Sequence, residues 1–273
     1  MAEADSPPED LERENRILQR KLHRLEANVQ RMEEFQGTNS TILSGLLRDL
    51  EVERARSHQL LLNVLPQRII DRLNAGETLI ADGHENVTVL FSDIVGFTMI
   101  SSETPPSELV AELNGLFSGF DAICDDAGVD KIKTVGDAYL AVGGLAGDHG
   151  IGDGGIGDGR AGELAIADAA LRMVAFADER AARGGWQIRI GIHAGPIVAG
   201  VVGTSKFAYD VWGDTVNTAS RLETTSEPGR IHVSADLARR IEARFVVQRR
   251  GMVDLKGKGS AETYWLLGRR EPE

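Results

Sequence analysis

Apolar residues recur at alternating spacings of four and three near the start of the chain. These positions are Leu11, Leu18, Leu22, Leu25, Val29 and Met32. The spacing is a heptad pattern in which leucines fill d positions and Asn15 occupies an a position. Because an asparagine amide pairs with its own copy only when two helices are aligned, the pattern predicts a parallel coiled coil in one register. The alternative is a single amphipathic helix packed on its own domain.

A second helical pattern follows from Thr41. Its apolar positions are Leu43, Leu47, Leu50, Leu61 and Val64. Residues 37–40, Gly-Thr-Asn-Ser, predict a break before it, because glycine and short polar side chains favour helix ends. Arg54 and Ser57 fall on its apolar seam and weaken the centre, which suggests a coil able to change register.

Beyond Pro66 the pattern changes to a short helix ended by Gly76 and then to strands alternating with helices. The order is βαββαβ, followed by a further strand, a short helix and a last strand pair. This order predicts an α+β, ferredoxin-like sheet with helices on one face. Residues 146–160, rich in glycine and aspartate, predict a loop. The predicted organisation is a disordered tail (1–10), a helical coiled coil with linker helix (11–65) and an α+β domain (66–273).

The segment KIKTVGDAY, residues 131–139, predicts a β-hairpin. Alternation along its first strand places Lys131 and Lys133 on one face. Gly136 and Asp137 form the two-residue turn, because glycine suits the turn types that match strand twist. An acid at a hairpin tip is ordinary turn chemistry, so this segment alone assigns Asp137 no role.

Charge and composition narrow the classes of partner. The net charge is −12 and the pI is about 5.0, which opposes binding to a long phosphate polymer, so no nucleic-acid partner is expected. Cys124 is the only cysteine, which excludes an intrachain disulfide and fits a reducing compartment. No apolar run approaches the roughly 20 residues of a membrane span, and the polar start lacks a signal peptide. These features predict a cytoplasmic chain.

Asp93 lies where a continuous apolar strand, residues 86–94, runs out into a polar, glycine-containing segment. Asp137 lies at the hairpin tip. Two carboxylates at the ends of neighbouring strands are suited to share hard divalent cations, which need oxygen ligands and keep phosphates as co-ligands.

Four segments in order resemble the signature segments of class III nucleotidyl cyclases, the adenylyl and guanylyl cyclases. They are FSDIVGFT, KIKTVGDAY, IRIGIHAGPIVAGVVG and YDVWGDTVNTASRLE, and LLLNVLP precedes them. The resemblance implies that Asp93, Asp137 and the backbone carbonyl of Ile94 bind two Mg²⁺ or Mn²⁺ ions. Such ions would activate the ribose 3′-hydroxyl and brace the triphosphate.

The same resemblance implies catalytic roles for Asn217 and Arg221, which orient the ribose and stabilise charge at the reacting phosphate. They lie four residues apart and so share one helix face. Lys256 resembles the lysine that meets the terminal phosphates, with Lys258 as the alternative. His193 belongs to a signature segment, but within a strand we interpret it as a packed or interface histidine.

Lys133 and Asp210 match the base-reading positions of the family. Adenine offers an acceptor at N1 and a donor at its amine, which complement a lysine and an aspartate. A guanylyl cyclase is expected to carry an acid at position 133 and a small or neutral residue at 210. The chain is therefore predicted to be an adenylyl cyclase that converts ATP to cyclic AMP and pyrophosphate.

The resemblance also implies a homodimer, because in the family each site lies between two catalytic domains and this chain contains both halves. The parallel coil would hold the two copies together. Two alternatives are a guanylyl cyclase and a non-catalytic dimerisation or regulatory module of the same fold. Loss of a metal aspartate or of Arg221 would favour the module, and neither is missing.

Overall fold

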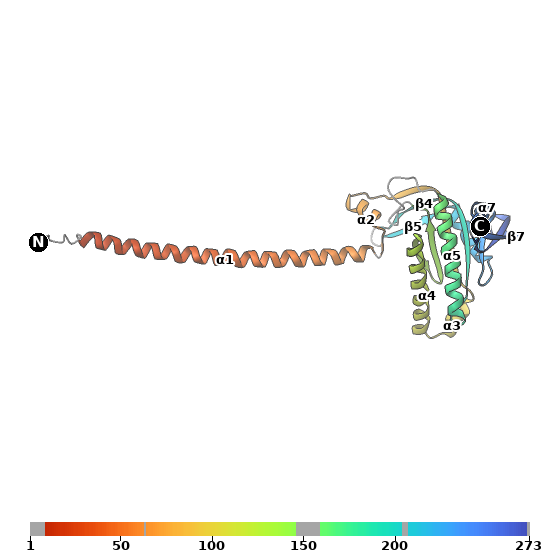
Figure 1. The fold of residues 1–273 in the computed structure, drawn as a ribbon, viewed down its shortest axis with the longest axis horizontal. Coiled ribbons are helices and arrows are strands. Elements are labelled where there is room, and N and C mark those ends of the chain that lie inside the picture. The colour runs from red at the N-terminus through yellow and green to blue at the C-terminus, as the bar shows by residue number, and fades with distance from the viewer. Residues whose placement is uncertain (1–8, 63, 146–158, 204–206, 272–273) are drawn as a thin grey trace. The chain divides into compact units, whose positions relative to one another are not determined.

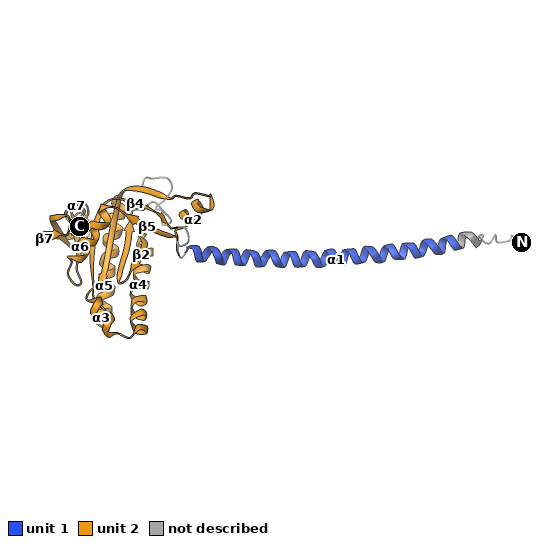
Figure 2. Ribbon diagram, turned by 180° about the vertical axis from the view of Figure 1, so that it is seen from behind, with its two compact units in different colours: residues 1–63 blue, residues 64–273 orange. Residues whose placement is uncertain are grey.

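A computed structural model describes residues 9–62, 64–145, 159–203 and 207–271. The chain divides into two compact units, Met1–Asn63 and Val64–Glu273 (Figure 2). Most of the predicted glycine-rich loop, together with the first eight residues of the predicted tail, lies outside the described residues. Within the described ranges, no helix is both long and apolar enough to cross a membrane.

The first unit is one helix, α1 (Glu9–Leu62), so the predicted break at residues 37–40 is wrong. The short polar side chains fit the helix interior because their hydroxyls bond carbonyls four residues earlier. Thr38 Oγ1 donates to the Glu34 carbonyl, and Thr41 Oγ1 donates to the Gly37 carbonyl, each at 2.9 Å. These hydroxyls therefore bond within one continuous helix and do not cap a new one.

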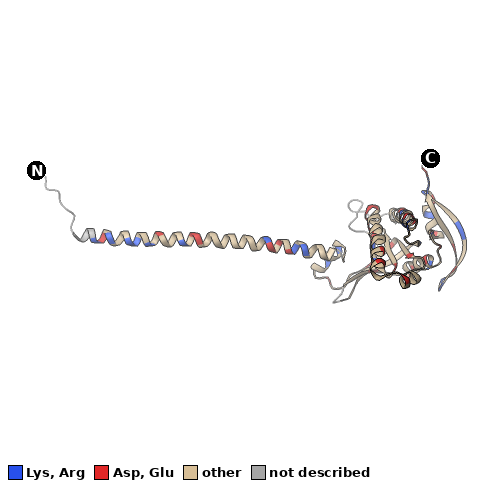
Figure 3. Cartoon of the chain, turned by 90° about the horizontal axis from the view of Figure 1, so that it is seen from below, with Lys and Arg blue, Asp and Glu red and all other residues tan. Residues whose placement is uncertain are grey.

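Apolar side chains along α1 are exposed. Leu18, Leu25 and Met32 on the predicted seam are 57%, 61% and 59% exposed. Charged residues mark both halves of α1, and an uncharged stretch lies between Glu34 and Arg48 (Figure 3). The long helix is thus present, while its pairing into a coiled coil stays a prediction.

The second unit contains an eight-stranded sheet and six helices among the described residues (Figure 1). Its helices are α2 (Gln67–Asn74), α3 (Phe97–Glu103), α4 (Pro106–Ala127), α5 (Gly159–Ala181), α6 (Asp214–Thr224) and α7 (Ala235–Ile241). Its strands are β1 (Ala81–Ile94), β2 (Asp130–Val135), β3 (Ala138–Gly143), β4 (Ile188–Val202), β5 (Ala208–Trp212), β6 (Ile231–Ser234), β7 (Phe245–Leu255) and β8 (Gly259–Arg269).

The strand order is β2-β3-β1-β4-β6-β8-β7, with β5 paired to β4 off this path. Strands β1, β2, β3 and β4 are antiparallel neighbours in the order expected of a ferredoxin-like βαββαβ unit. The predicted mixed α+β sheet is therefore confirmed. The remaining strands extend it on the β4 side.

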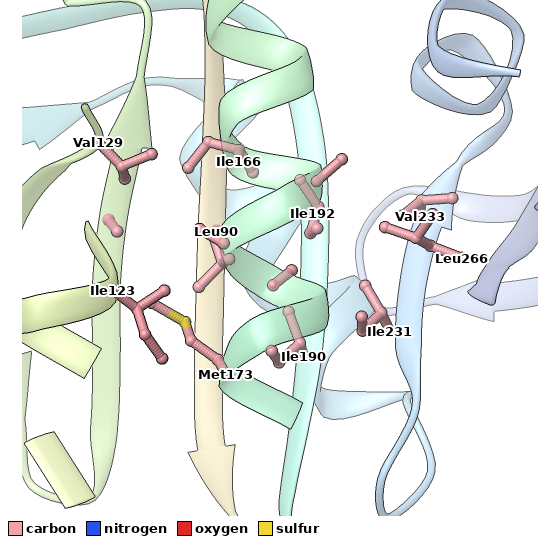
Figure 4. Close-up of a cluster of buried hydrophobic side chains, with 14 of the residues drawn as sticks. Leu90, Ile123, Val129, Ile166, Met173, Ile190, Ile192, Ile231, Val233 and Leu266 are labelled. Atoms are coloured by element: carbon pink, nitrogen blue, oxygen red, sulfur yellow. The ribbon is translucent and has the colours of Figure 1, made fainter. Parts of the chain in front are cut away.

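A large apolar core lies between one face of the sheet and helices α4, α5 and α7. Leu90 and Ile190 from the two central strands are fully buried there, together with Met173 from α5 (Figure 4). Phe120 from α4 is fully buried in the same core. Burial of apolar side chains of this size is the dominant stabilising term for such a layer.

The other face of the sheet is also covered, so the prediction of helices on one face is wrong. Helix α6 packs closely on β4, because a Cβ added to Gly191 would lie 2.0 Å from the backbone nitrogen of Glu223. Helix α2 contributes Ile69 and Ile70 to a second core on this face, together with Val89 of β1. The glycine at 191 permits the close approach that brings α6 onto the sheet.

Candidate active site

Asp93 and Asp137 lie side by side although 44 positions separate them. Asp93 is next to the last residue of β1, and Asp137 lies in the β2–β3 turn, where Gly136 has a φ of +63°. Pairing of Ser92 with Tyr139 brings these two ends together. Burial first, and the neighbouring Asp93 carboxyl second, raise the pKa of Asp137 to about 6. The geometry thus concentrates two carboxylates in one partly buried place.

An arginine and a glutamate missing from the predicted site complete this cluster. Arg189 Nη2 donates to Asp93 Oδ2 at 2.8 Å, and its Nε donates to Glu223 Oε1 at 2.7 Å. Glu223 lies on the buried side of α6, and that burial raises its pKa. The sequence did contain a sign of Arg189. It is a charged residue between Ile188 and Ile190 in an otherwise apolar part of β4, and it faces the opposite side of the strand from them.

The donor set at this cluster fits hard divalent cations. Carboxylate oxygens are the ligands that Mg²⁺ and Mn²⁺ prefer, and a cation would relieve the mutual repulsion of Asp93 and Asp137. Ile94 has its side chain in the main core, so its backbone carbonyl is the group it can offer. No group of three or more acidic, histidine or cysteine side chains suited to a metal occurs among the described residues.

The β2–β3 hairpin differs from its prediction in one respect. Lys131 pairs with Ala141 and Lys133 with Leu140, so a β-bulge at Ile132 interrupts the alternation. Adjacent residues of β3 face opposite sides of the sheet, and the two lysines therefore do so as well. The prediction that they share one face is wrong. Lys131 instead reaches α4.

Lys131 and Lys133 have separate acidic partners. Lys131 Nζ donates to Asp121 of α4 at 2.7 Å. Lys133 Nζ donates to Asp210 Oδ2 of β5 at 2.5 Å, and Asp210 Oδ1 accepts from the Val211 backbone N–H at 2.8 Å. The lysine and aspartate side chains are 41% and 18% exposed. The structure thus brings together the two predicted base-reading residues in a pair that a ligand can reach.

Asn217 and Arg221 lie on the outer side of α6. The buried side of that helix carries Ala219 and Glu223, about half a turn away from the other pair at 100° per residue. Asn217 is exposed and Arg221 half-buried. Neither side chain makes a hydrogen bond or ion pair with any residue in the described ranges. They consequently face away from the Asp93 cluster.

The two C-terminal lysines differ in their surroundings. Lys258 Nζ forms an ion pair with Asp214 at the start of α6. Lys256 is exposed, and its side chain forms no ion pair within the part of the chain that the structure describes. This contrast supports Lys256 as the lysine available to a ligand.

His193 behaves as a packed residue. Its Nδ1 lies 2.8 Å from Ser234 Oγ, and Ser234 caps α7. Burial lowers the pKa of His193, which favours the neutral ring.

The predicted site residues therefore form separate groups within one chain. The Asp93 and Asp137 cluster is one group, and the Lys133–Asp210 pair is another. No hydrogen bond or ion pair joins these two groups in the described ranges. Asn217 and Arg221 face outward from both the cluster and the core.

Comparisons with known proteins place this arrangement among cyclases. Residues 79–268 match the family described as adenylate and guanylate cyclase catalytic domains. The chain is 42% identical over 227 residues to a Mycobacterium tuberculosis adenylate cyclase, covering 81% of this chain and 48% of that protein. It thus spans about half the length of this curated relative.

Two solved structures share the fold at comparable identity. The guanylate cyclase domain of RhGC from Catenaria anguillulae, in complex with GTP, is 39% identical with a TM-score of 0.62 and covers 69% of this chain and 100% of that chain. The catalytic core of a rhodopsin-guanylyl cyclase with converted specificity, in complex with ATPαS, is 40% identical with a TM-score of 0.61 and covers 69% and 98%. Relatives of both base specificities are therefore similar to this chain.

Proposed function

The chain belongs to the family of adenylate and guanylate cyclase catalytic domains, and from this premise we propose that it is an adenylyl cyclase. In this proposal it converts ATP to 3′,5′-cyclic AMP and pyrophosphate. The observation that carries the choice of base is the Lys133–Asp210 pair, 2.5 Å from Nζ to Oδ2. The ammonium donates to adenine N1, and the carboxylate accepts from the adenine amine. Guanine presents the reverse order of donor and acceptor at these atoms.

The Asp93 cluster supplies the metal ligands in this proposal. Asp93, Asp137 and the Ile94 carbonyl would hold two Mg²⁺ or Mn²⁺ ions. When bound, such ions supply the positive charge that favours ionisation of the ribose 3′-hydroxyl and offsets the charge of the departing pyrophosphate. Arg189 fixes the orientation of Asp93 through their 2.8 Å ion pair. Preorganised ligands of this kind avoid reorganisation during the reaction.

The remaining residues position the nucleotide. The ribose 3′-oxygen attacks the α-phosphorus, the bond to the bridging oxygen of the β-phosphate breaks, and the hydroxyl proton is released. Asn217 orients the ribose, and Arg221 offsets charge on the reacting phosphate, for which a planar guanidinium fork is better suited than an ammonium. Lys256 contacts the terminal phosphates. Each of these roles needs an accessible side chain, as all three have.

A homodimer follows from the division of these groups. A second copy related by a twofold axis would present its outward-facing Asn217 and Arg221 to the carboxylate cluster of the first. The two equivalent sites would then each draw on both chains. The exposed heptad seam of α1 would hold the copies in parallel, with Asn15 setting the register.

A guanylyl cyclase is the second candidate. The 39% identity to a guanylate cyclase domain with bound GTP favours it. The core of converted specificity with bound ATPαS has nearly the same overall similarity to this chain, so the base pocket must decide. Lys133 and Asp210 are the groups in that pocket, and their donor and acceptor order favours adenine.

The test is an assay of the purified chain with ATP and with GTP, each with Mg²⁺ and with Mn²⁺. We expect cyclic AMP formation with a kcat/KM at least about tenfold above that for GTP, as expected when a site pairs one base and leaves groups unpaired with the other. A preference for GTP would make the chain a guanylyl cyclase. No product from either nucleotide would support the non-catalytic module.

A further inference from the structure

Helix α2 shares the second core with β5, the strand that carries Asp210. Ile69 and Ile70 of α2 are buried with Tyr209 and Val211 of β5 in the second core. Strand β5 pairs with β4 and with no other strand in the described ranges. Its position over the sheet therefore depends on side-chain packing more than on a second hydrogen-bonded neighbour.

A polar contact is added to this packing at Tyr209. Arg68 Nη2 of α2 donates to the Tyr209 hydroxyl at 2.6 Å. The Arg68 guanidinium also lies over the Tyr209 ring, with Cζ 5.6 Å from the centroid. A hydrogen bond at the ring's edge and a cation over its face restrict the tyrosine in two directions. Tyr209 is only 8% exposed, so water provides little substitute for this contact.

The backbone around Asp210 is tightly enclosed as well. Asp210 pairs with Gly200 of β4. A Cβ added to Gly200 would lie 2.3 Å from the Ile80 carbonyl oxygen, at the entry to β1. The residue before β1 thus lies close to the backbone of the strand pair, in the same core as α2 and Tyr209.

Lys133, which forms the ion pair with Asp210, lies on β2, and β2 contacts β5. Asp130, at the start of β2, is near enough to Tyr209 for its charge to contribute to the raised pKa of that hydroxyl, after the larger effect of burial. Tyr209 therefore lies where α2, β2 and β5 meet. The base-reading residues Lys133 and Asp210 belong to two of these three elements.

We propose that Arg68 and Tyr209 are positioning residues for base recognition, which hold β5 against α2 and thereby set where the Asp210 carboxylate meets Lys133. The proposal rests on the proposed function, because it concerns the base pocket of that site. Tyr209 and Asp210 are consecutive residues, so a displacement of the tyrosine moves the aspartate backbone with it. Small displacements of a recognition group weaken discrimination between bases more than they weaken phosphate binding.

The experiment compares Tyr209→Phe, Arg68→Met and the double variant in the full chain. Tyr209→Phe keeps the ring and removes only the hydroxyl, and Arg68→Met keeps an apolar stem. The matched control is Arg72→Met on the same helix, because Arg72 pairs with Glu77 and Asp82 and not with β5. For each variant, kcat/KM is measured with ATP and with GTP, and inhibition by pyrophosphate and the midpoint of thermal unfolding are recorded.

We expect each single variant to reduce the preference between the two nucleotides by about three- to tenfold, the range spanned by the loss of one hydrogen bond. The double variant should lose less preference than the sum of the two single losses, because both single variants remove the hydrogen bond between Arg68 and the Tyr209 hydroxyl. Pyrophosphate inhibition should stay within about twofold of wild type, since pyrophosphate has no base. Arg68→Lys, which keeps a donor, should retain more of the preference than Arg68→Met. Arg72→Met should leave the preference unchanged.

An unchanged preference in Tyr209→Phe would overturn the proposal, as would an equal change in Arg72→Met. Loss of thermal stability with no change in preference would reduce Arg68 and Tyr209 to a purely structural role. A wild-type chain that prefers GTP would overturn the proposed adenine specificity alone. The variants would then still test the role of the contact between Arg68 and Tyr209. Its loss should reduce the preference between ATP and GTP whichever of the two is favoured.

Discussion

The two units of this chain differ in how far their apolar side chains are exposed. In the second unit, Leu90 and Ile190 are fully buried between the sheet and its helices. On α1, Leu22 and Leu25 are 58% and 61% exposed. A row of exposed leucines at heptad spacing is typical of a helix whose partner is another chain. Residues 64–273 therefore bury their own core and carry the proposed chemistry, while α1 leaves its apolar seam exposed, as the proposed pairing with a second copy requires.

The sharpest test of this division removes the proposed metal ligands. We expect Asp93→Ala or Asp137→Ala to reduce the turnover of ATP by at least about a hundredfold, because each removes a ligand that the chemistry requires. Both carboxyls lie at the edge of the sheet and contribute little apolar packing, so the fold and the dimer should persist. Initial rates, circular dichroism and sedimentation measure these quantities.

The control for this test is Asp49→Ala on α1, an exposed acid in the other unit. It should leave turnover within about twofold, as surface substitutions usually do. Activity above a few per cent of wild type in Asp93→Ala or Asp137→Ala would show that the carboxylate pair is not the metal site.

A second test asks whether one site draws on two chains. Asp93→Ala and Arg221→Ala chains, each inactive alone, should regain activity on mixing. Half of the dimers are then mixed and each holds one intact site, so activity should approach about a quarter of the wild-type value. Activity is measured after subunit exchange has been shown with labelled chains. Exchange without recovery would mean that the site is built within one chain.

Much of this arrangement was predictable from local rules. The meeting of Asp93 and Asp137 followed from their places at the ends of strands, and the hairpin turn followed from Gly136. The bulge at Ile132 was not predictable from alternation along β2, and it places Lys131 where it pairs with Asp121 of α4. An ion pair between residues of two different elements cannot be inferred from the alternation of side chains along one strand.

The helix break was mispredicted for a related reason. Glycine and short polar residues at 37–40 are as suitable for a cap as for a helix interior with bonds back to earlier carbonyls. Arg189 and Glu223 escaped notice because each lies inside an element whose periodicity explains its neighbours. Arg189 is a charged residue within an apolar strand, but its two partners are identified only when β1, β4 and α6 are assembled around Asp93.

A third prediction concerns the base pocket within the second unit. Lys133→Glu combined with Asp210→Cys should lower kcat/KM for ATP by about tenfold or more, because a site built to pair a base rejects one that leaves groups unpaired. GTP should improve relative to ATP. The control is Lys131→Ala, which breaks a comparable ion pair on the opposite face of the sheet.

Lys131→Ala should leave the ratio of the two specificity constants nearly unchanged and alter stability by no more than about 1 kcal/mol, as is usual for exposed pairs. An ATP preference that survives in the double variant, or that changes equally in Lys131→Ala, would exclude Lys133 as the residue that distinguishes adenine from guanine.

The smallest expected effect concerns α1, and it tests the other half of the comparison. If the seam of α1 adds affinity to a dimer that the second unit also forms, removing residues 1–40 should matter only when protein is dilute, because dimer stability depends on protomer concentration. Activity per chain should then fall more steeply on dilution than it does for the full chain.

Leu18→Ala with Leu25→Ala should reproduce the direction of this effect, because both side chains lie on the seam. Arg20→Ala with Arg24→Ala changes side chains on the outer face of the same turns, so this control should not reproduce the effect of dilution. Equal activity per chain at every dilution for all of these forms would show that α1 does not hold the two copies together.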